Sequence, residues 1–275
     1  MIENAGNRKK VSLSQREIDT YHEEGLVIPD YKLPPAKLAR LREGLEQLIK
    51  DNPNIRSEKL ISAHLSEYAN EGVRGNRIFL EFASDPDLLD LVECVIGPDM
   101  ILWGAQVFCK PAGDGMEVPW HQDGQYWPIR PLATCTVWVA IDDVTRENGA
   151  MRYIPGSHKS GIYQHRTDPS EALVLHQVMA PGLVDETKAR DDVLEAGQLS
   201  LHDVYLVHGS PANRSTKRRA GLALRYMPTT SHFDRTIPSA ERGAGNADFA
   251  RRPIFLVRGV DRCGKNEFKL GHPGL

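Results

Sequence analysis

The sequence predicts a mainly β fold, in which an antiparallel sandwich or barrel carries helices on its outside. Helical patterns are confined to residues 1–97. After Gly97, short β-rich runs alternate with turns rich in Pro, Gly and Asn. The 275 residues are enough for one large domain or two small ones, and we expect a single domain over 1–275. We therefore expect a mostly helical N-terminal part that packs on a β core over 98–260.

Three segments carry the signals of helices, after a polar arm over residues 1–12. In the first segment, Ser14 and Glu17 form a capping box and Gly25 suits the helix end. In the second, proline stands near the first turn and four leucines repeat at the spacing of one helical face. The third is an apolar run that ends at Gly97. The predicted helices are 14–25, 34–51 and 85–97.

The β core is predicted from runs of strand length that are rich in β-branched, aromatic and other apolar residues. Between them, the segment 163–192 is long, polar and weakly patterned. Such a segment favours a functional loop or lid over a second domain. Another irregular stretch precedes the last run. The predicted strand regions are 100–111, 133–144, 150–158, 197–210, 218–228 and 254–259.

The composition excludes several classes of function. The net charge is −3, so no basic field favours a nucleic-acid partner. No apolar run approaches the roughly 18 residues of a membrane span, and the first residues lack the apolar core of a signal peptide. We therefore expect a cytoplasmic protein. The four cysteines form no CxxC motif and suit buried free thiols.

The stretch WHQDGQYW, residues 120–127, places His121 and Asp123 two residues apart. On an extended chain both side chains project to the same side, and imidazole with carboxylate suits a divalent first-row metal. Two ligands hold a metal poorly, so a third is expected. His208, which ends an apolar run before Gly and Ser, is the best candidate. His202 is the competitor and would point to the same side of a regular strand.

Two histidines and one carboxylate on one face are typical of non-haem Fe(II) oxygenases, which keep open metal positions. Such an enzyme also needs an anchor for its co-substrate. Arg219, eleven residues after His208, would grip a distal carboxylate, with help from the Ser210 hydroxyl. Thr136 is placed to meet the other end of that molecule. The nearby alternatives for the anchor are Arg214, Arg218 and Arg225.

Three motifs together resemble the phytanoyl-CoA dioxygenase family of Fe(II)/2-oxoglutarate enzymes. These are WHQDGQYW, NGAMRYIPGSHK and HGSPANRSTKRRAG, and the resemblance runs over nearly the whole chain. It implies a double-stranded β-helix core, also called a jelly roll or cupin fold. It implies iron held by His121, Asp123 and His208, with no further catalytic acid or base. Arg219 and Ser210 match the family's 2-oxoglutarate positions, and Thr136 matches a frequent one.

The resemblance also implies the reaction. A hydroxylase of this family uses O2 and 2-oxoglutarate to hydroxylate an unactivated C–H bond, and it releases succinate and CO2. Related halogenases replace the carboxylate ligand with a small residue, whereas this sequence keeps Asp123. His158 lies in a family signature and has a structural interpretation. The rival interpretations from the residues are a zinc hydrolase and a cupin-like binding module without catalysis.

The substrate is expected to be a small polar molecule. Basic and amide groups beside aromatic rings suit a small anion or zwitterion. Bacterial hydroxylases of 2-aminoethylphosphonate and its N-trimethyl analogue are nearest in motif style. The alternatives are an amino acid, a quaternary amine or a natural-product intermediate. The candidate substrate contacts are Gln106, Lys110 (or a rim charge), Tyr126, Trp127, Trp138 and Asn76.

Overall fold

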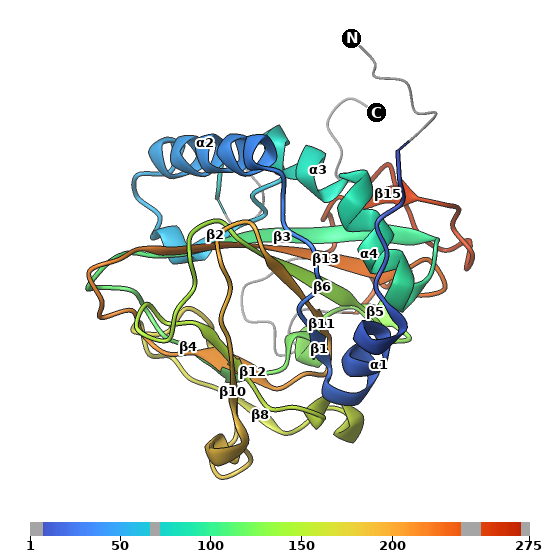
Figure 1. The fold of residues 1–275 in the computed structure, drawn as a ribbon. Coiled ribbons are helices and arrows are strands. Elements are labelled where there is room, and N and C mark those ends of the chain that lie inside the picture. Colours follow the sequence, from blue (N-terminus) through green and yellow to red (C-terminus); the bar gives the residue numbers. More distant parts are fainter. Residues whose placement is uncertain (1–7, 67–71, 238–248, 271–275) are drawn as a thin grey trace.

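The computed structural model describes residues 8–66, 72–237 and 249–270. Two β sheets face each other, and helices cover the outer side of the larger one (Figure 1). No helix in the described ranges is both long enough and apolar enough to cross a bilayer. The α-helices are α1 (Gln15–Glu24), α2 (Pro35–Asp51), α3 (Arg77–Ala83) and α4 (Pro86–Ile96). The short 3-10 helices are η1 (Ser57–Lys59), η2 (Asp123–Tyr126), η3 (Ser157–Ser160) and η4 (Glu186–Lys188).

The larger sheet has the strand order β1-β11-β6-β13-β3-β15, and β2 also pairs with β3. All its pairings are antiparallel. Its strands are β1 (Leu26–Val27), β2 (Leu60–Ile61), β3 (Met100–Lys110), β6 (Cys135–Ala140), β11 (Leu199–Asp203), β13 (Arg219–Pro228) and β15 (Phe255–Arg258).

The smaller sheet has the order β10-β7-β12-β4, and two further two-stranded sheets are formed by β14 with β5 and by β8 with β9. The predicted jelly-roll core with peripheral helices is confirmed by this arrangement. The strands are β4 (Val118–His121), β5 (Ile129–Arg130), β7 (Met151–Tyr153), β8 (His165–Thr167), β9 (Gln177–Met179), β10 (Arg190–Asp192), β12 (His208–Ser210) and β14 (His232–Phe233).

The helices begin and end where local signals place them. Ser14 and Glu17 complete the capping box of α1, and Gly25 ends that helix in the left-handed region, at φ 84°. The leucine face of α2 is buried. The sequence did not predict α3, which Asn76 caps by accepting a hydrogen bond from the Ile78 amide. At seven residues, α3 is too short for a periodic signal and depends on the core for its stability.

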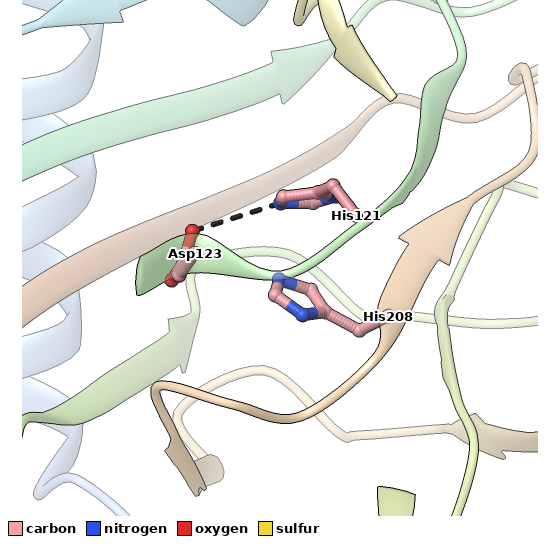
Figure 2. A group of neighbouring side chains, drawn as sticks. All are labelled: His121, Asp123 and His208. Atoms are coloured by element: carbon pink, nitrogen blue, oxygen red, sulfur yellow. Dashed lines mark ion pairs between the residues drawn. The ribbon is translucent and has the colours of Figure 1, made fainter. Parts of the chain in front are cut away.

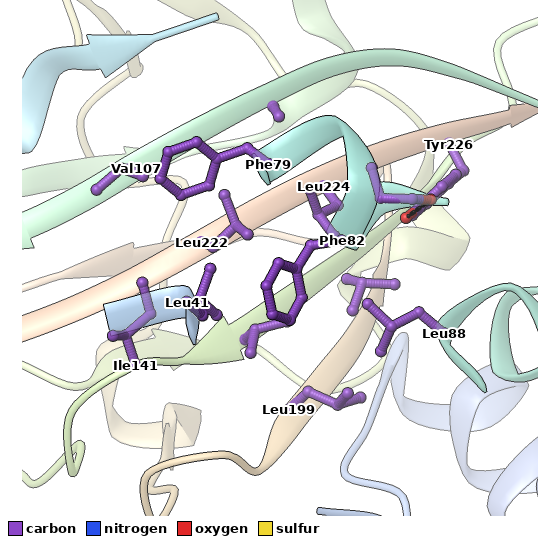
Figure 3. Close-up of a cluster of buried hydrophobic side chains, with 14 of the residues drawn as sticks. Leu41, Phe79, Phe82, Leu88, Val107, Ile141, Leu199, Leu222, Leu224 and Tyr226 are labelled. Carbon is purple, nitrogen blue, oxygen red and sulfur yellow. Dashed lines mark hydrogen bonds between the residues drawn. The ribbon is translucent and has the colours of Figure 1, made fainter. Parts of the chain in front are cut away.

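The core lies between the larger sheet and the helices. Alternate residues of β13 and β3, such as Leu222, Leu224 and Val107, pack under Phe79 and Phe82 of α3 (Figure 3). The side chains between them in sequence point to the opposite face of the sheet. That second face carries Phe108, Thr136, Trp138, Arg219 and Arg225, all of which line a pocket between the two sheets.

The segment 163–192, which we expect to be a loop or lid, contains short secondary-structure elements. It contains the β8-β9 pair, η4 and β10. The predicted strand region 197–210 is two strands, not one. β11 ends at Asp203 and belongs to the larger sheet, whereas β12 begins at His208 and belongs to the smaller one. His202 and His208 therefore reach the pocket from opposite walls.

Candidate metal centre

Three side chains converge at one end of the smaller sheet. His121 ends β4, Asp123 begins η2, and His208 begins β12. One ligand atom from each lies within 4.8 Å of the others. His121 and His208 are directly opposed across the antiparallel β4-β12 pair, and their ring centroids are 4.2 Å apart. Figure 2 shows the three side chains directed toward one another.

The backbone orients both imidazoles. The Nδ1 atom of His121 lies 2.8 Å from the Pro119 carbonyl oxygen, and Nδ1 of His208 lies 2.9 Å from the Leu206 carbonyl oxygen. A proton on each Nδ1 is donated to that carbonyl, which leaves Nε2 with a free lone pair. Burial holds the pKa of His208 well below its usual value, so its ring is neutral. These residues fit a divalent metal ion.

The two oxygens of Asp123 face different groups. Oδ1 lies 3.6 Å from Nε2 of His121. Oδ2 faces the larger sheet, where it is 3.5 Å from the Thr136 hydroxyl, 3.6 Å from Nε2 of His202 and 4.0 Å from Nε of Arg225. Burial alone would raise the pKa of Asp123, but Arg225 and the imidazoles outweigh burial and hold it well below its usual value. The side chain is therefore a carboxylate.

A pocket surrounds the cluster and encloses about 430 Å³ of space, part of it open to solvent. Both sheets contribute to its wall, and apolar side chains alternate with a few polar ones. The lining residues are Phe108, Val118, His121, Asp123, Thr136, Trp138, Met151, His202, His208, Gly209, Ser210, Arg219, Ala223 and Arg225.

Arg219 and Ser210, the predicted carboxylate anchor, both line the pocket. The guanidinium donates from Nε and Nη2 to the Gly149 carbonyl oxygen at 3.1 and 2.6 Å, and its centre lies 5.2 Å from the Trp138 ring. Burial lowers the pKa of Arg219 to about 10, so it remains charged at neutral pH. A buried guanidinium that has no carboxylate partner among the described residues suits an anionic ligand.

Lys110 stands behind this group and does not line the pocket. It is fully buried, so the alternative of an exposed rim charge is wrong. Its Nζ donates to the Ser210 hydroxyl at 2.7 Å and also to the carbonyl oxygens of Ser210 and Pro211. Burial and the nearby Arg219 lower the pKa of Lys110 to about 6. Through Ser210, the lysine contacts the wall of the site.

The alternatives to Arg219 have other partners. Arg218 pairs with Asp142 and with Glu46 on the opposite face of the sheet. Arg214 donates to the Gly113 carbonyl oxygen. Only Arg225 of these three lines the pocket, beside Asp123.

The six predicted substrate contacts are distributed unevenly. Trp138 lines the pocket. Gln106 does not line the pocket, but its Oε1 accepts hydrogen bonds from both terminal nitrogens of the pocket residue Arg225 at 3.4 Å. Trp127 is buried against Trp103, and Tyr126 stacks on Phe249 with ring centroids 6.4 Å apart. The pocket wall includes neither of these two, nor Asn76, whose side chain caps α3.

Sequence reasoning missed part of the wall. Met151 of β7 and Val118 of β4 line the pocket, although neither was a candidate. The one sequence signal for these residues is strand alternation, by which Met151 shares a face of β7 with Tyr153 and Val118 shares a face of β4 with Trp120. Alternation alone does not show which of the two faces of a strand meets the site.

Comparisons with known proteins agree with this arrangement. Residues 21–221 match the family described as Phytanoyl-CoA dioxygenase (PhyH). A peroxisomal phytanoyl-CoA dioxygenase from Homo sapiens is 26% identical over 240 residues, covering 81% of this chain and 70% of that protein. A probable alpha-ketoglutarate-dependent hypophosphite dioxygenase from Stutzerimonas stutzeri is 31% identical over 142 residues, or 50% and 49% of the two chains.

Solved structures share the fold. The apo structure of the non-heme monooxygenase ThoJ superposes with a TM-score of 0.66 at 27% identity, over 89% of this chain and 84% of that one.

Proposed function

Because this chain belongs to the phytanoyl-CoA dioxygenase family, we propose that His121, Asp123 and His208 hold the iron of a hydroxylase that acts on a small anionic substrate. The chain is a non-haem Fe(II)/2-oxoglutarate-dependent dioxygenase. Its co-substrates are 2-oxoglutarate and O2. We rank 2-aminoethylphosphonate and its N-trimethyl analogue first among substrates.

One observation carries the ligand assignment. One ring nitrogen from each of the two histidines and one carboxylate oxygen lie within 4.8 Å of one another on the wall of a pocket. A structural zinc site needs four enclosing ligands, whereas three ligands on one side leave positions for small molecules. Arg219 and Ser210 in the same wall support a place for the distal carboxylate of 2-oxoglutarate. Thr136, whose hydroxyl donates to Asp123, supports a place for the other end of 2-oxoglutarate.

When bound, Fe(II) with 2-oxoglutarate and O2 supplies an oxidant strong enough for an unactivated C–H bond, and succinate and CO2 are released. The protein orients the metal ligands and the co-substrate and keeps bulk water out of the pocket. Backbone carbonyls fix the two imidazoles, and the buried Arg219 guanidinium would hold the far carboxylate of 2-oxoglutarate. Phe108, Trp138 and Met151 give the pocket apolar walls that exclude bulk water.

We favour a small polar substrate, because the pocket wall combines apolar rings with the charged side chains of Arg219 and Arg225. The Stutzerimonas stutzeri relative is named for hypophosphite, a small phosphorus oxyanion, which supports a phosphonate. An amino acid, quaternary amine or natural-product intermediate is the alternative substrate. We also propose one domain over 1–275, a lid over 163–192 and a cytoplasmic location.

The metal assignment is tested by anaerobic titration of the protein with Fe(II) and 2-oxoglutarate. We expect a weak visible metal-to-ligand charge-transfer band, and its loss in the His208→Ala and Asp123→Ala variants. Ser14→Ala is a matched control, because Ser14 caps α1 far from the pocket. A band of undiminished strength in either ligand variant would refute the assignment.

The substrate class is tested by a screen scored by succinate release. It compares 2-aminoethylphosphonate, its N-trimethyl analogue, proline and choline. We expect the two phosphonates to stimulate succinate release most. Stimulation by choline or proline alone would move the enzyme to the alternative class.

A further inference from the structure

We propose that Arg225 and His202 form a second anion site, which binds the negatively charged group of the substrate. This inference rests on the proposed function and deepens it, because it states which chemical group the substrate must carry. The site lies on the larger sheet, across the pocket from His121 and His208, and is separate from the anchor at Arg219.

Arg225 is a nearly buried cation with weak internal partners. Its side chain is 12% exposed, and its one ion pair among the described residues is with Asp123, at 4.0 Å. The terminal nitrogens reach Gln106 only at 3.4 Å, and Nε has no hydrogen-bond partner within the described ranges. Trp127 and Trp103 hold the guanidinium in place at 5.5 and 6.0 Å. A buried charge with donors open toward a pocket suits an anionic ligand.

His202 is the second, independent sign of a ligand. It is 2% exposed and lines the pocket, yet neither ring nitrogen has a hydrogen-bond partner in the part of the chain that the structure describes. Its nearest polar neighbour is Asp123, with 3.6 Å between Nε2 and Oδ2. Buried imidazoles are normally hydrogen-bonded. An unpartnered ring in a pocket wall is therefore available to a ligand.

The sheet register places these groups in one row. His202 of β11 is opposite Thr136 of β6, and Thr136 is in turn opposite Arg225 of β13. Arg219 lies on the same strand as Arg225 but six residues earlier, which separates their backbones by roughly 20 Å. The single carboxylate that Arg219 would hold therefore does not also occupy Arg225, whose donors remain open to a second anionic group.

The charges lead to the same conclusion. Asp123 is the nearest anion to Arg225, but its charge is committed to the metal once the ion is bound. The distal carboxylate of 2-oxoglutarate is committed to Arg219. Arg225 is then left without a compensating charge in a buried site, which is unfavourable. A substrate with a phosphonate or carboxylate group supplies the missing charge.

Direct binding tests this site without turnover. Protein loaded with Zn(II) and 2-oxoglutarate is titrated calorimetrically with 2-aminoethylphosphonate, methylphosphonate, acetate and, as a ligand without an anionic group, ethanolamine. We compare the wild type with Arg225→Gln, Arg225→Lys and His202→Asn. Arg218→Gln is the matched control, because it removes a charge from the same strand region on the other face.

We expect Arg225→Gln to weaken binding of the phosphonates at least about tenfold, since charge-assisted hydrogen bonds are lost. Arg225→Lys should weaken it less, His202→Asn should weaken it measurably, and Arg218→Gln should leave it unchanged. Ethanolamine should not bind. The affinity for 2-oxoglutarate should change less than about threefold in all four variants.

Three results would overturn the inference. They are wild-type affinity in Arg225→Gln, no binding of any anion to the wild type, and a loss of 2-oxoglutarate affinity in Arg225→Gln with anion binding intact. The last result would assign Arg225 to the co-substrate. We expect the iron-loaded enzyme to release succinate slowly even without substrate, and this release separates the anion site from the proposed function. If the Arg225→Gln variant still releases succinate, the oxygenase assignment stands. If the wild type releases none, the proposed function itself is refuted.

Discussion

Replacement of Gly221 by alanine would drive a methyl group into the indole of Trp138. A Cβ at Gly221 would lie 2.0 Å from Cζ2 and 2.4 Å from Cη2 of that ring. Ordinary carbon contacts are about 3.5–4.0 Å, so the ring must retreat by roughly 1.5 Å. The indole is buried, and the space open to it is the pocket, where it packs against Arg219.

Overpacking of this kind costs about 1–3 kcal/mol of unfolding free energy. Because the displaced ring also disturbs Arg219, we expect the concentration of 2-oxoglutarate needed for half-maximal rate to rise at least about fivefold. Urea denaturation followed by tryptophan fluorescence measures the first effect, and succinate release against 2-oxoglutarate concentration measures the second. Both effects should appear in the same variant.

Gly104→Ala is the matched control for stability. It lies on the neighbouring strand β3, and a Cβ there would meet only Cδ of Arg225, at 3.9 Å. We expect its unfolding free energy to equal that of the wild type or to exceed it slightly, since alanine narrows the unfolded ensemble. A Gly221→Ala protein with the wild-type denaturation midpoint and 2-oxoglutarate requirement would refute the packing argument.

Three further outcomes are expected. Arg219→Ala should raise the 2-oxoglutarate requirement by more than about tenfold, whereas Arg218→Ala should not; equal effects in a succinate assay would move the anchor. Burial raises the pKa of Asp192 to about 6, above its unfolded value of about 3.9. Its contribution to the free energy of unfolding, roughly 3 kcal/mol, is therefore present below about pH 4 and is lost as the pH rises through about 6. Asp192→Asn should flatten that part of a stability–pH profile, and an unchanged profile would contradict the assignment. Ser14→Ala should cost about 1 kcal/mol by urea denaturation, because it breaks the capping box of α1, and an unchanged midpoint would show that the cap contributes nothing.

Local signals predicted the helices well. Ser14 with Glu17, Gly25 and the leucines of α2 act within a few residues of one another, so they can be recognised in sequence. The helix α3 escaped because its stability comes from Phe79 and Phe82 packing on a sheet formed by residues far along the chain. The break between β11 and β12 escaped for the same reason. Nothing local shows that two successive strands enter different sheets.

The site was predictable where its residues form a motif. The proximity of His121 and Asp123 follows from their spacing, and the turn after His208 distinguished it from His202. The distance between Arg219 and Arg225 along one face of β13 also follows from alternation. Burial did not follow, because Lys110 shares by alternation the face of Gln106 and Phe108 on β3, yet it stands behind the wall, where Ser210 covers it. Trp127 similarly supports Arg225 from outside the pocket.

The main chain sets the direction of both histidine rings. Each ring is held by the carbonyl two residues before it, at Pro119 and at Leu206, and no substitution of a side chain removes a carbonyl group. Side chains around the rings are therefore free to diverge without releasing them. A scaffold of this kind can acquire new substrates by exchanging residues such as Met151 or Gln106, while the geometry that would hold its reactive ion is inherited intact.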